Sequence, residues 1–153
     1  MDKARYICDA TFNELRCTEV LPGDILISRL PDPVGRSCIL PDLGTEMITA
    51  VDCTIIRFDL KKVIPDFFVL YSATLNYYAE LKKHLTGSSR QRISRNNLGK
   101  IKIWVPSLKT QEQIIAKLSA VQDYKKQLLE QKSKLKELFD SVLQESINEG
   151  MAN

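Results

Sequence analysis

The segment from Thr110 to Asn148 contains neither proline nor glycine. Thr110 and Gln113 form a capping box at its start, which predicts that a helix begins there. A helix running to Asn148 would extend for ~38 residues, or ~57 Å at 1.5 Å per residue, whereas a typical globular helix has about 11–12 residues. One small domain within a chain of 153 residues cannot cover so long a helix, so this element constrains the rest of the fold.

Apolar residues recur along this segment with a period of seven. One seam position of the heptad is occupied by Ile114, Val121, Leu128, Leu135 and Val142. The other seam position is occupied by Leu118, Lys125, Lys132, Phe139 and Ser146. This pattern is typical of a coiled-coil helix, and its two lysines favour an antiparallel partner with facing glutamates over a uniform parallel dimer. The alternative is a helix that folds back over its own domain.

Residues 21–58 carry three short apolar runs separated by turn residues. The first lies within Leu21–Arg29 after a Pro-Gly turn, and the second, Ser37–Leu40, follows the turn Pro31–Gly35. The third, Ala50–Phe58, is rich in β-branched residues. Each run has the length and composition of a strand. The sequence therefore predicts a small β-rich unit.

Helical patterns follow this unit. From Asp66, a plausible N-cap, apolar residues repeat at spacings of three and four until Gly87, which is placed to end the helix. A short helical turn is expected over 94–98, and a strand over Lys100–Val105 before Pro106.

Together these elements predict an α+β fold: a small β-rich domain with a packed helix, followed by one long C-terminal coiled-coil helix. The domain is expected to span residues 1–109 and the helix residues 110–148, and residues 149–153 are expected to form a tail. At 153 residues the chain has room for one compact domain and an appendage.

Positive charge is concentrated just before the long helix. Between Leu81 and Gln111 there are eight Lys/Arg residues and no Asp or Glu. The whole chain is only +3, so the residues outside this run sum to −5. Such a distribution favours binding to a polyanion such as nucleic acid.

The loop within this run has side chains suited to DNA. Arg90, Gln91 and Arg92 can make bidentate contacts to base edges, and the small hydroxyl side chains can donate to phosphate oxygens. These hydroxyls are Ser88, Ser89 and Ser94, and Arg95 follows them. The alternative interpretation is a solvated surface loop.

Several other functions are disfavoured. The longest stretch without a charged residue, Phe67–Ala79, is shorter than the ~18 residues that span a bilayer. With no leader sequence either, we expect a cytoplasmic protein that contacts no membrane. The four cysteines form no Cys-x-x-Cys pair, and a single histidine cannot complete a zinc set with them. We therefore expect no metal and no cofactor, and thiols that are reduced and mostly buried.

A nuclease is the first enzyme to consider, because Asp66, Glu80 and Lys82 loosely resemble a metal-binding nuclease pattern. Glu80 and Lys82, however, are two residues apart on a predicted helix and point to different faces. The sequence also lacks a glycine-rich phosphate loop, a Gly-x-Ser-x-Gly motif and an amino-methyltransferase signature. We therefore expect a recognition part without catalytic machinery.

The order of motifs resembles the specificity subunit of type I restriction-modification enzymes. The matching segments are Gly23–Leu26, the loop from Gly87 to Ser94, Leu98, the predicted strand Ile101–Pro106, and Leu108 with Gln111–Ile114. The resemblance implies a target recognition domain that contacts one half of a split DNA sequence, and a helix that acts as spacer. In the family, two such domains and two antiparallel helices set the distance between half-sites. They also dock the modification (methyltransferase) subunits and, through them, the restriction subunit.

Carried over to this chain, the resemblance places the loop residues Ser88, Ser89, Arg90, Gln91 and Arg92 on DNA. It places the start of the spacer helix at Gln111 and Ile114. The seam is then expected to bind a partner through Gln111, Ile114, Leu118, Val121, Leu128, Leu135, Phe139 and Val142. Arg29 and Arg36 are added on physical grounds as arginines at strand ends, where the alternative role is to cover apolar surface.

Two departures from the family shape the functional hypotheses. The chain holds one recognition domain and one spacer helix, and its domain is short at the N-terminus. The leading hypothesis is a half-size specificity subunit that forms a homodimer through antiparallel C-terminal helices and binds double-stranded DNA. A second is a truncated specificity fragment that acts mainly as a protein-interaction module through its helix. A third, a nuclease, requires magnesium-dependent cleavage that is lost on changing Asp66 or Glu80.

Overall fold

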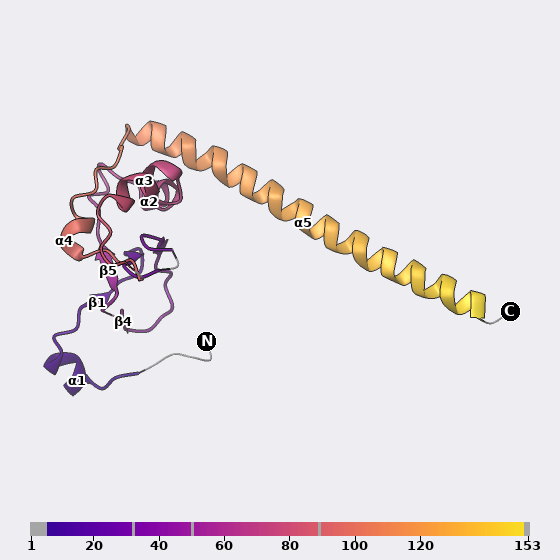
Figure 1. Cartoon of the computed structure of the whole chain (residues 1–153), viewed down its shortest axis with the longest axis horizontal. Helices are drawn as coiled ribbons and strands as arrows, with labels where there is room; N and C mark the ends of the chain where they lie inside the picture. Colours follow the sequence, from indigo (N-terminus) through magenta and orange to yellow (C-terminus); the bar gives the residue numbers. More distant parts are fainter. Residues whose placement is uncertain (1–5, 32, 50, 89, 152–153) are drawn as a thin grey trace. The chain divides into compact units, whose positions relative to one another are not determined.

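The computed structural model describes residues 6–31, 33–49, 51–88 and 90–151, with side chains described as far as residue 148. The chain divides into two compact units, Met1–Glu112 and Gln113–Asn153. The first contains all of the strands and the shorter helices, and the second is formed by the rest of the long C-terminal helix (Figure 1). The predicted α+β fold with a long C-terminal helix is confirmed.

A three-stranded antiparallel sheet lies at the centre of the first unit. Strand β2 (Ile25–Ser28) pairs with β3 (Ser37–Ile39) on one side and with β5 (Cys53–Ile56) on the other. Ile25 and Ile27 of β2 are buried, as expected when alternate residues of a strand face the core. All three predicted strands are confirmed with shorter bounds, and Ala50, the predicted start of the third, lies outside the described residues.

Two further strands form a separate antiparallel pair. Strand β1 (Glu19–Val20) pairs with β4 (Met47–Ile48). The N-terminal helix α1 (Asp9–Glu14) precedes them. None of these elements was predicted. The two strands have two residues each, which is too short to show alternation, and the six residues of α1 are too few to show a helical period.

Two helices replace the single helix predicted from Asp66 to Gly87. Helix α2 spans Pro65–Ser72 and α3 spans Leu75–Lys82. The break is at Thr74, whose extended backbone and side-chain oxygen cap α3 by accepting from the Tyr77 amide at 3.3 Å. The expected N-cap role of Asp66 is also wrong, because Ile64 is the N-cap and Asp66 lies in the first turn. Sequence periodicity continued across the break because both helices present apolar residues to one core.

The core joins the sheet to α2, α3 and the segment after them. Its buried members are Ile25, Ile27, Val34, Val63, Phe68, Tyr77, Leu81, Ile93 and Leu98. Burial raises the pKa of Tyr77 to about 12. Gly35, in the turn between β2 and β3, has a φ of +84° and approaches Tyr77 and Leu81 so closely that a Cβ at this position would overlap the Leu81 side chain. Glycine is therefore required there both by the backbone angle and by packing.

The segment between residue 99 and the long helix does not form the predicted strand. Helix α4 (Arg95–Leu98) confirms the predicted helical turn. After it, Ile101 and Ile103 pack against the core, whereas Lys102 is exposed. This side-chain alternation resembled a strand, but residues 100–105 pair with no strand in the described part of the chain.

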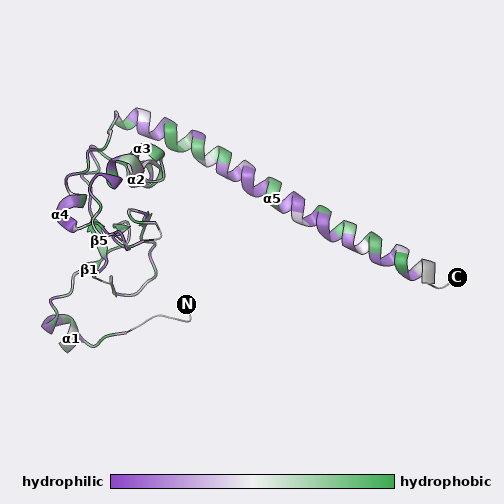
Figure 2. Cartoon of the chain, viewed as in Figure 1, coloured by the Kyte–Doolittle hydropathy of each residue, from purple (hydrophilic) through white to green (hydrophobic). Residues whose placement is uncertain are grey.

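Helix α5 spans Leu108–Met151 and begins two residues before the predicted start. Ser107 acts at its N-terminus, where its Oγ accepts from the Thr110 amide at 3.3 Å. The helix also continues through the predicted tail as far as Met151. Hydrophobic residues recur along its length (Figure 2). Among the described helices, none is long and apolar enough to cross a membrane.

Candidate nucleic-acid interface

The basic loop, residues 87–91, is closed at its base by backbone hydrogen bonds. The Thr86 amide donates to the Arg92 carbonyl and the Arg92 amide donates to the Thr86 carbonyl, each at 2.9 Å. Gly87 begins the loop with a φ of +100°, and a Cβ there would lie 2.7 Å from the Arg90 carbonyl oxygen. Only glycine fits this tight return of the chain. The two ends of the loop are therefore held together by backbone hydrogen bonds.

The C-terminal side of the loop is anchored in the first unit. Ile93 is 1% exposed, and its amide donates to the Arg29 carbonyl at 3.2 Å. Ser94 caps α4 by accepting from the Asn97 amide at 3.1 Å, and the Asn97 side-chain amide donates to the His84 carbonyl at 3.1 Å. These contacts fix the base of the loop to β2 and α3, so its outward side chains start from a rigid support.

Arg29 lies just after β2 and joins three separate segments. Its amide donates to the Asp52 carbonyl at 2.8 Å, its carbonyl accepts from Ile93, and its guanidinium Nη2 donates to the Val51 carbonyl. A pocket of about 290 Å³ opens there, lined by Arg29, Leu30, Asp52, Thr86, Arg92, Ile93 and Ser94. The structure thus brings together three of the predicted residues, Arg29, Arg92 and Ser94, from distant parts of the sequence.

The other predicted DNA-binding residues do not line this pocket. Arg36 is exposed immediately before β3, where its carbonyl accepts from the Ser28 amide at 2.9 Å. Ser89 lies outside the described residues. The remaining side chains, all exposed, are Ser88, Arg90, Gln91 and Arg95.

Two polar lining residues, Asp52 and Thr86, were missed by the sequence prediction, as were the apolar Leu30 and Ile93. The spacing of Thr86 and Arg92 around Gly87 is compatible with a closed loop and could have indicated Thr86. Nothing in the sequence indicates Asp52, because it reaches the pocket only through the pairing of β2 with β5.

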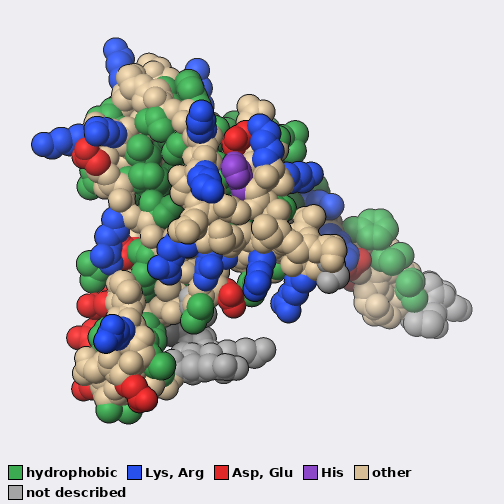
Figure 3. Space-filling view, turned by 60° about the vertical axis from the view of Figure 1, so that its left-hand side comes forward, with side chains coloured by type: hydrophobic (Ala, Val, Ile, Leu, Met, Phe, Trp, Pro, Cys, Tyr) green, Lys and Arg blue, Asp and Glu red, His purple; other side chains and the backbone are tan. Residues whose placement is uncertain are grey.

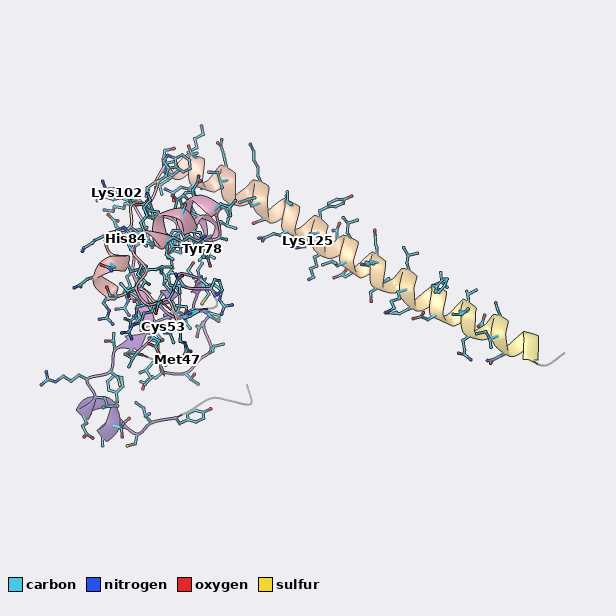
Figure 4. All side chains as sticks on the ribbon, viewed as in Figure 1. Met47, Cys53, Tyr78, His84, Lys102 and Lys125 are labelled. Carbon is cyan, nitrogen blue, oxygen red and sulfur yellow. The ribbon has the colours of Figure 1, made fainter. Side chains whose placement is uncertain are left out.

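Positive side chains gather on the face that carries the single histidine (Figure 3). His84 and Lys102 come from separate segments and lie on the same part of the first unit (Figure 4). The hydrogen bond from Lys83 lowers the pKa of Glu80, and electrostatic interactions with Lys83, His84 and Lys102 lower it further. The positive charges that are close together in the sequence therefore also lie close together on the surface of the first unit.

The predicted partner-binding residues fall into two groups. Those from Ile114 onward lie on α5 in the second unit, namely Ile114, Leu118, Val121, Leu128, Leu135, Phe139 and Val142. That unit consists of one helix and so provides no second element to cover this stripe. Gln111 is the exception.

Gln111 is 0% exposed, so its expected role on a partner-binding surface is corrected. Its side-chain oxygen accepts from the Ile64 amide at 2.9 Å, and its side-chain nitrogen donates to the Lys62 and Pro106 carbonyls, each at 2.8 Å. One amide thus satisfies three backbone groups of the first unit. Its role is to hold the first turn of α5 and the segment before α2 in place.

Replacing Gln111 with leucine is expected to lower the free energy of unfolding by about 2–3 kcal/mol, because three backbone groups lose their partner. Equilibrium unfolding in urea measures this change. The matched control is Gln113→Leu at an exposed position, where a change within about 0.5 kcal/mol is expected. Equal effects of the two substitutions would contradict the structural role of Gln111.

The structure gives no support to a metal or nuclease site in its described part. No group of three or more His, Cys, Asp or Glu residues there is placed to hold a metal ion. Asp66 and Glu80 lie on different helices, α2 and α3.

The prediction of mostly buried thiols is wrong, since Cys8 and Cys38 are exposed and Cys17 and Cys53 are half-buried.

Comparison of the sequence with models of known protein families gives a match to one family. The model of the type I restriction modification DNA specificity domain matches residues 14–138, which include the strands, the basic loop and most of α5. A search of curated protein sequences found no match. Because the family model covers most of the chain, the protein belongs to the family of type I restriction modification DNA specificity domains.

Proposed function

We propose that the protein is a half-size specificity subunit of a type I restriction-modification system. Residues 1–109 would form the target recognition domain that reads one half of a bipartite DNA site. Residues 110–148 would act as the spacer and dimerisation helix. The observation that carries this proposal is the family match over residues 14–138, which include the strands, the basic loop and most of α5. The apolar seam of α5 supports it, because such a seam is typical of a helix that pairs with another helix.

The geometry of the basic loop supports DNA reading by its tip. Arg90 and Gln91 are exposed on a loop whose base is closed by the Thr86–Arg92 hydrogen bonds and anchored by buried Ile93. Side chains held on a rigid support lose less conformational freedom on binding. Arginine and glutamine can each make two hydrogen bonds to one base in the major groove.

Pairing of two copies would complete the function. Antiparallel α5 helices of two copies would bury the apolar seam and place one recognition domain at each end, so that a symmetric split site is read. The paired helices would also dock the modification subunit and, through it, the restriction subunit. The chain itself would be the non-catalytic recognition part of that complex.

The decisive experiment selects bound sequences from a random duplex pool with the modification subunit present. We expect a symmetric site of two half-sites with a fixed gap, and a dimer mass in solution at tens of micromolar. A strict monomer would overturn the pairing. Tight binding to the modification subunit without any sequence preference would instead assign the chain to protein interaction alone.

Replacing Arg90 with alanine is expected to weaken binding to the selected site by about 1–3 kcal/mol and to relax preference at one base in each half-site. Fluorescence anisotropy against a panel of single-base variants measures both effects. The control is Lys61→Ala, which removes one exposed positive charge outside the basic run. An equal loss for every sequence would mean that Arg90 contacts phosphate and reads no base.

A further inference from the structure

The pocket beside the basic loop is assembled from three segments that are distant in sequence. Arg29 comes from the end of β2, Asp52 from the residue before β5, and Arg92 from the closed base of the loop. Its volume of about 290 Å³ is at the lower end of the range of about 300–1,000 Å³ that is usual for small-molecule sites. It is therefore suited to one small chemical group.

Arg29 lines the pocket, and its guanidinium has no carboxylate partner among the residues that the structure describes. Its Nη2 donates to the uncharged Val51 carbonyl, and its Nε is buried and has no hydrogen-bond partner. Among the described residues, neither Arg29 nor Arg92 forms a salt bridge. A buried donor without a partner is destabilising unless a bound group satisfies it. Two arginines that form no salt bridge within the described part of the chain thus line one pocket, where their guanidinium groups can serve an anion.

A hydroxyl adds to these donors. Ser94 Oγ uses its acceptor capacity on the Asn97 amide, which leaves its hydrogen free to donate. The Thr86 hydroxyl is less free, since it donates to the Arg92 carbonyl at 3.2 Å. Guanidinium groups together with a hydroxyl are the donors that bind phosphate oxygens.

We infer that this pocket binds one phosphodiester group of the DNA backbone, an inference that rests on the proposed DNA-binding function. Phosphates project from the surface of a duplex, whereas base edges lie at the floor of the grooves. A recessed site therefore fits a phosphate, and a projecting loop tip fits a base edge. Arg29 and Arg92 set the register of the domain on DNA, while Arg90 and Gln91 read sequence.

Substitution of Asp52 tests the inference through an expected gain in DNA affinity, whereas substitution of an arginine should cause a loss. Asp52 lines the same pocket, and its carboxylate forms no salt bridge within the described part of the chain. A phosphate bound beside it would be repelled. Neutralising this carboxylate should therefore strengthen binding to every DNA sequence, which is the reverse of the effect expected for a carboxylate that accepts from a base.

The test measures the affinity of the full chain for its selected duplex and for an unrelated duplex at several salt concentrations. Arg92→Gln is expected to weaken both about tenfold and to lower the slope of log affinity against log salt by about one. Asp52→Asn is expected to strengthen both by severalfold. Arg29→Gln should behave as Arg92→Gln does, but because Arg29 also contacts Val51, Arg92→Gln is the variant that keeps the fold intact.

A scan with methylphosphonate, which removes the charge of one phosphate at a time, locates the contact. The unsubstituted chain should lose affinity at one phosphate in each half-site, and Arg92→Gln, which keeps only Arg29 in the pocket, should lose clearly less affinity there. Inorganic phosphate should compete no better than chloride at equal ionic strength. Stronger competition by inorganic phosphate would assign the pocket to a free anion and overturn the inference.

Two other results separate this inference from the function on which it rests. A change in preferred sequence on Arg92→Gln or Asp52→Asn, with the salt slope unaltered, would mean that the pocket reads a base, and DNA binding itself would stand. Failure of the unsubstituted chain to bind any duplex in the presence of the modification subunit would overturn the proposed function and this inference together.

Discussion

Replacing both Leu128 and Leu135 with aspartate is expected to convert the proposed dimer into a monomer. Both leucines occupy the apolar seam of α5. Burying one leucine stabilises an interface by about 1.5–3 kcal/mol. Two leucines in each of two copies therefore contribute roughly 6 kcal/mol or more, and the aspartates add the desolvation of charge. Sedimentation equilibrium of the full chain measures the change.

The affinity for DNA should also fall when the dimer is lost. A monomer contacts one half-site, so it keeps about half of the phosphate contacts and loses the benefit of linked binding. We expect the affinity for the split site to fall at least about 100-fold, a typical gain from linking two binding modules. The affinity for an isolated half-site should stay unchanged.

The matched control is the double substitution Gln127→Asp and Ser141→Asp. Both positions lie on α5 outside the seam and are exposed, so the control adds the same negative charge without touching the proposed interface. It should remain a dimer. If the two leucine substitutions also leave a dimer, the seam does not carry the pairing and serves the modification subunit or the chain's own recognition domain.

Replacing Gly35 with alanine is expected to lower the free energy of unfolding by roughly 3–4 kcal/mol. One part is backbone strain, because a φ of +84° is unfavourable for a residue with a Cβ. The larger part is overpacking, because the new methyl group would overlap Leu81 Cδ1 and lie 3.3 Å from Tyr77 Cε1, both in the core. Urea unfolding followed by circular dichroism measures the loss.

Gly23→Ala separates these two contributions. Gly23 has a φ of +87°, but a Cβ there would have nothing within 4 Å. This control should show the strain alone, about 1 kcal/mol. If Gly35→Ala is no more destabilising than Gly23→Ala, the close approach of the turn to α3 is not a source of stability.

Features that are encoded locally could be predicted from the sequence. The long helix follows from uninterrupted heptads, and the three central strands follow from short apolar runs between turn residues. The break at Thr74 could not be predicted from the sequence. Both helices bury apolar residues in the same core, so the apolar periodicity continues across the break. The alternation of residues 100–105 was also misleading, since packing against a core and pairing in a sheet produce the same pattern.

The candidate site was likewise predictable only where its features are encoded locally. Residues 87–92 could be selected from charge and side-chain type, and Arg29 from its place at a strand end. Their meeting in one pocket depends on the register of β2 with β5 and on the hydrogen bond from Ile93 to Arg29. Gln111 was assigned to a partner surface because the family resemblance placed it at the start of the spacer helix. It is buried because the backbone at residues 62–64 lies against it. This contact joins segments that are distant in sequence, so no local sequence pattern predicts it.

The closure of the basic loop by Thr86 and Arg92 also bears on how such a module diversifies. The two bonds at 2.9 Å use backbone atoms only, so they do not depend on the side chains between them. Exposed positions 88, 90 and 91 can then mutate at little expense to the stability of the domain. New DNA preferences can accumulate there by drift and selection, provided that Gly87 is retained for its φ of +100°. The framework and the variable surface can therefore evolve at different rates within one short segment of chain.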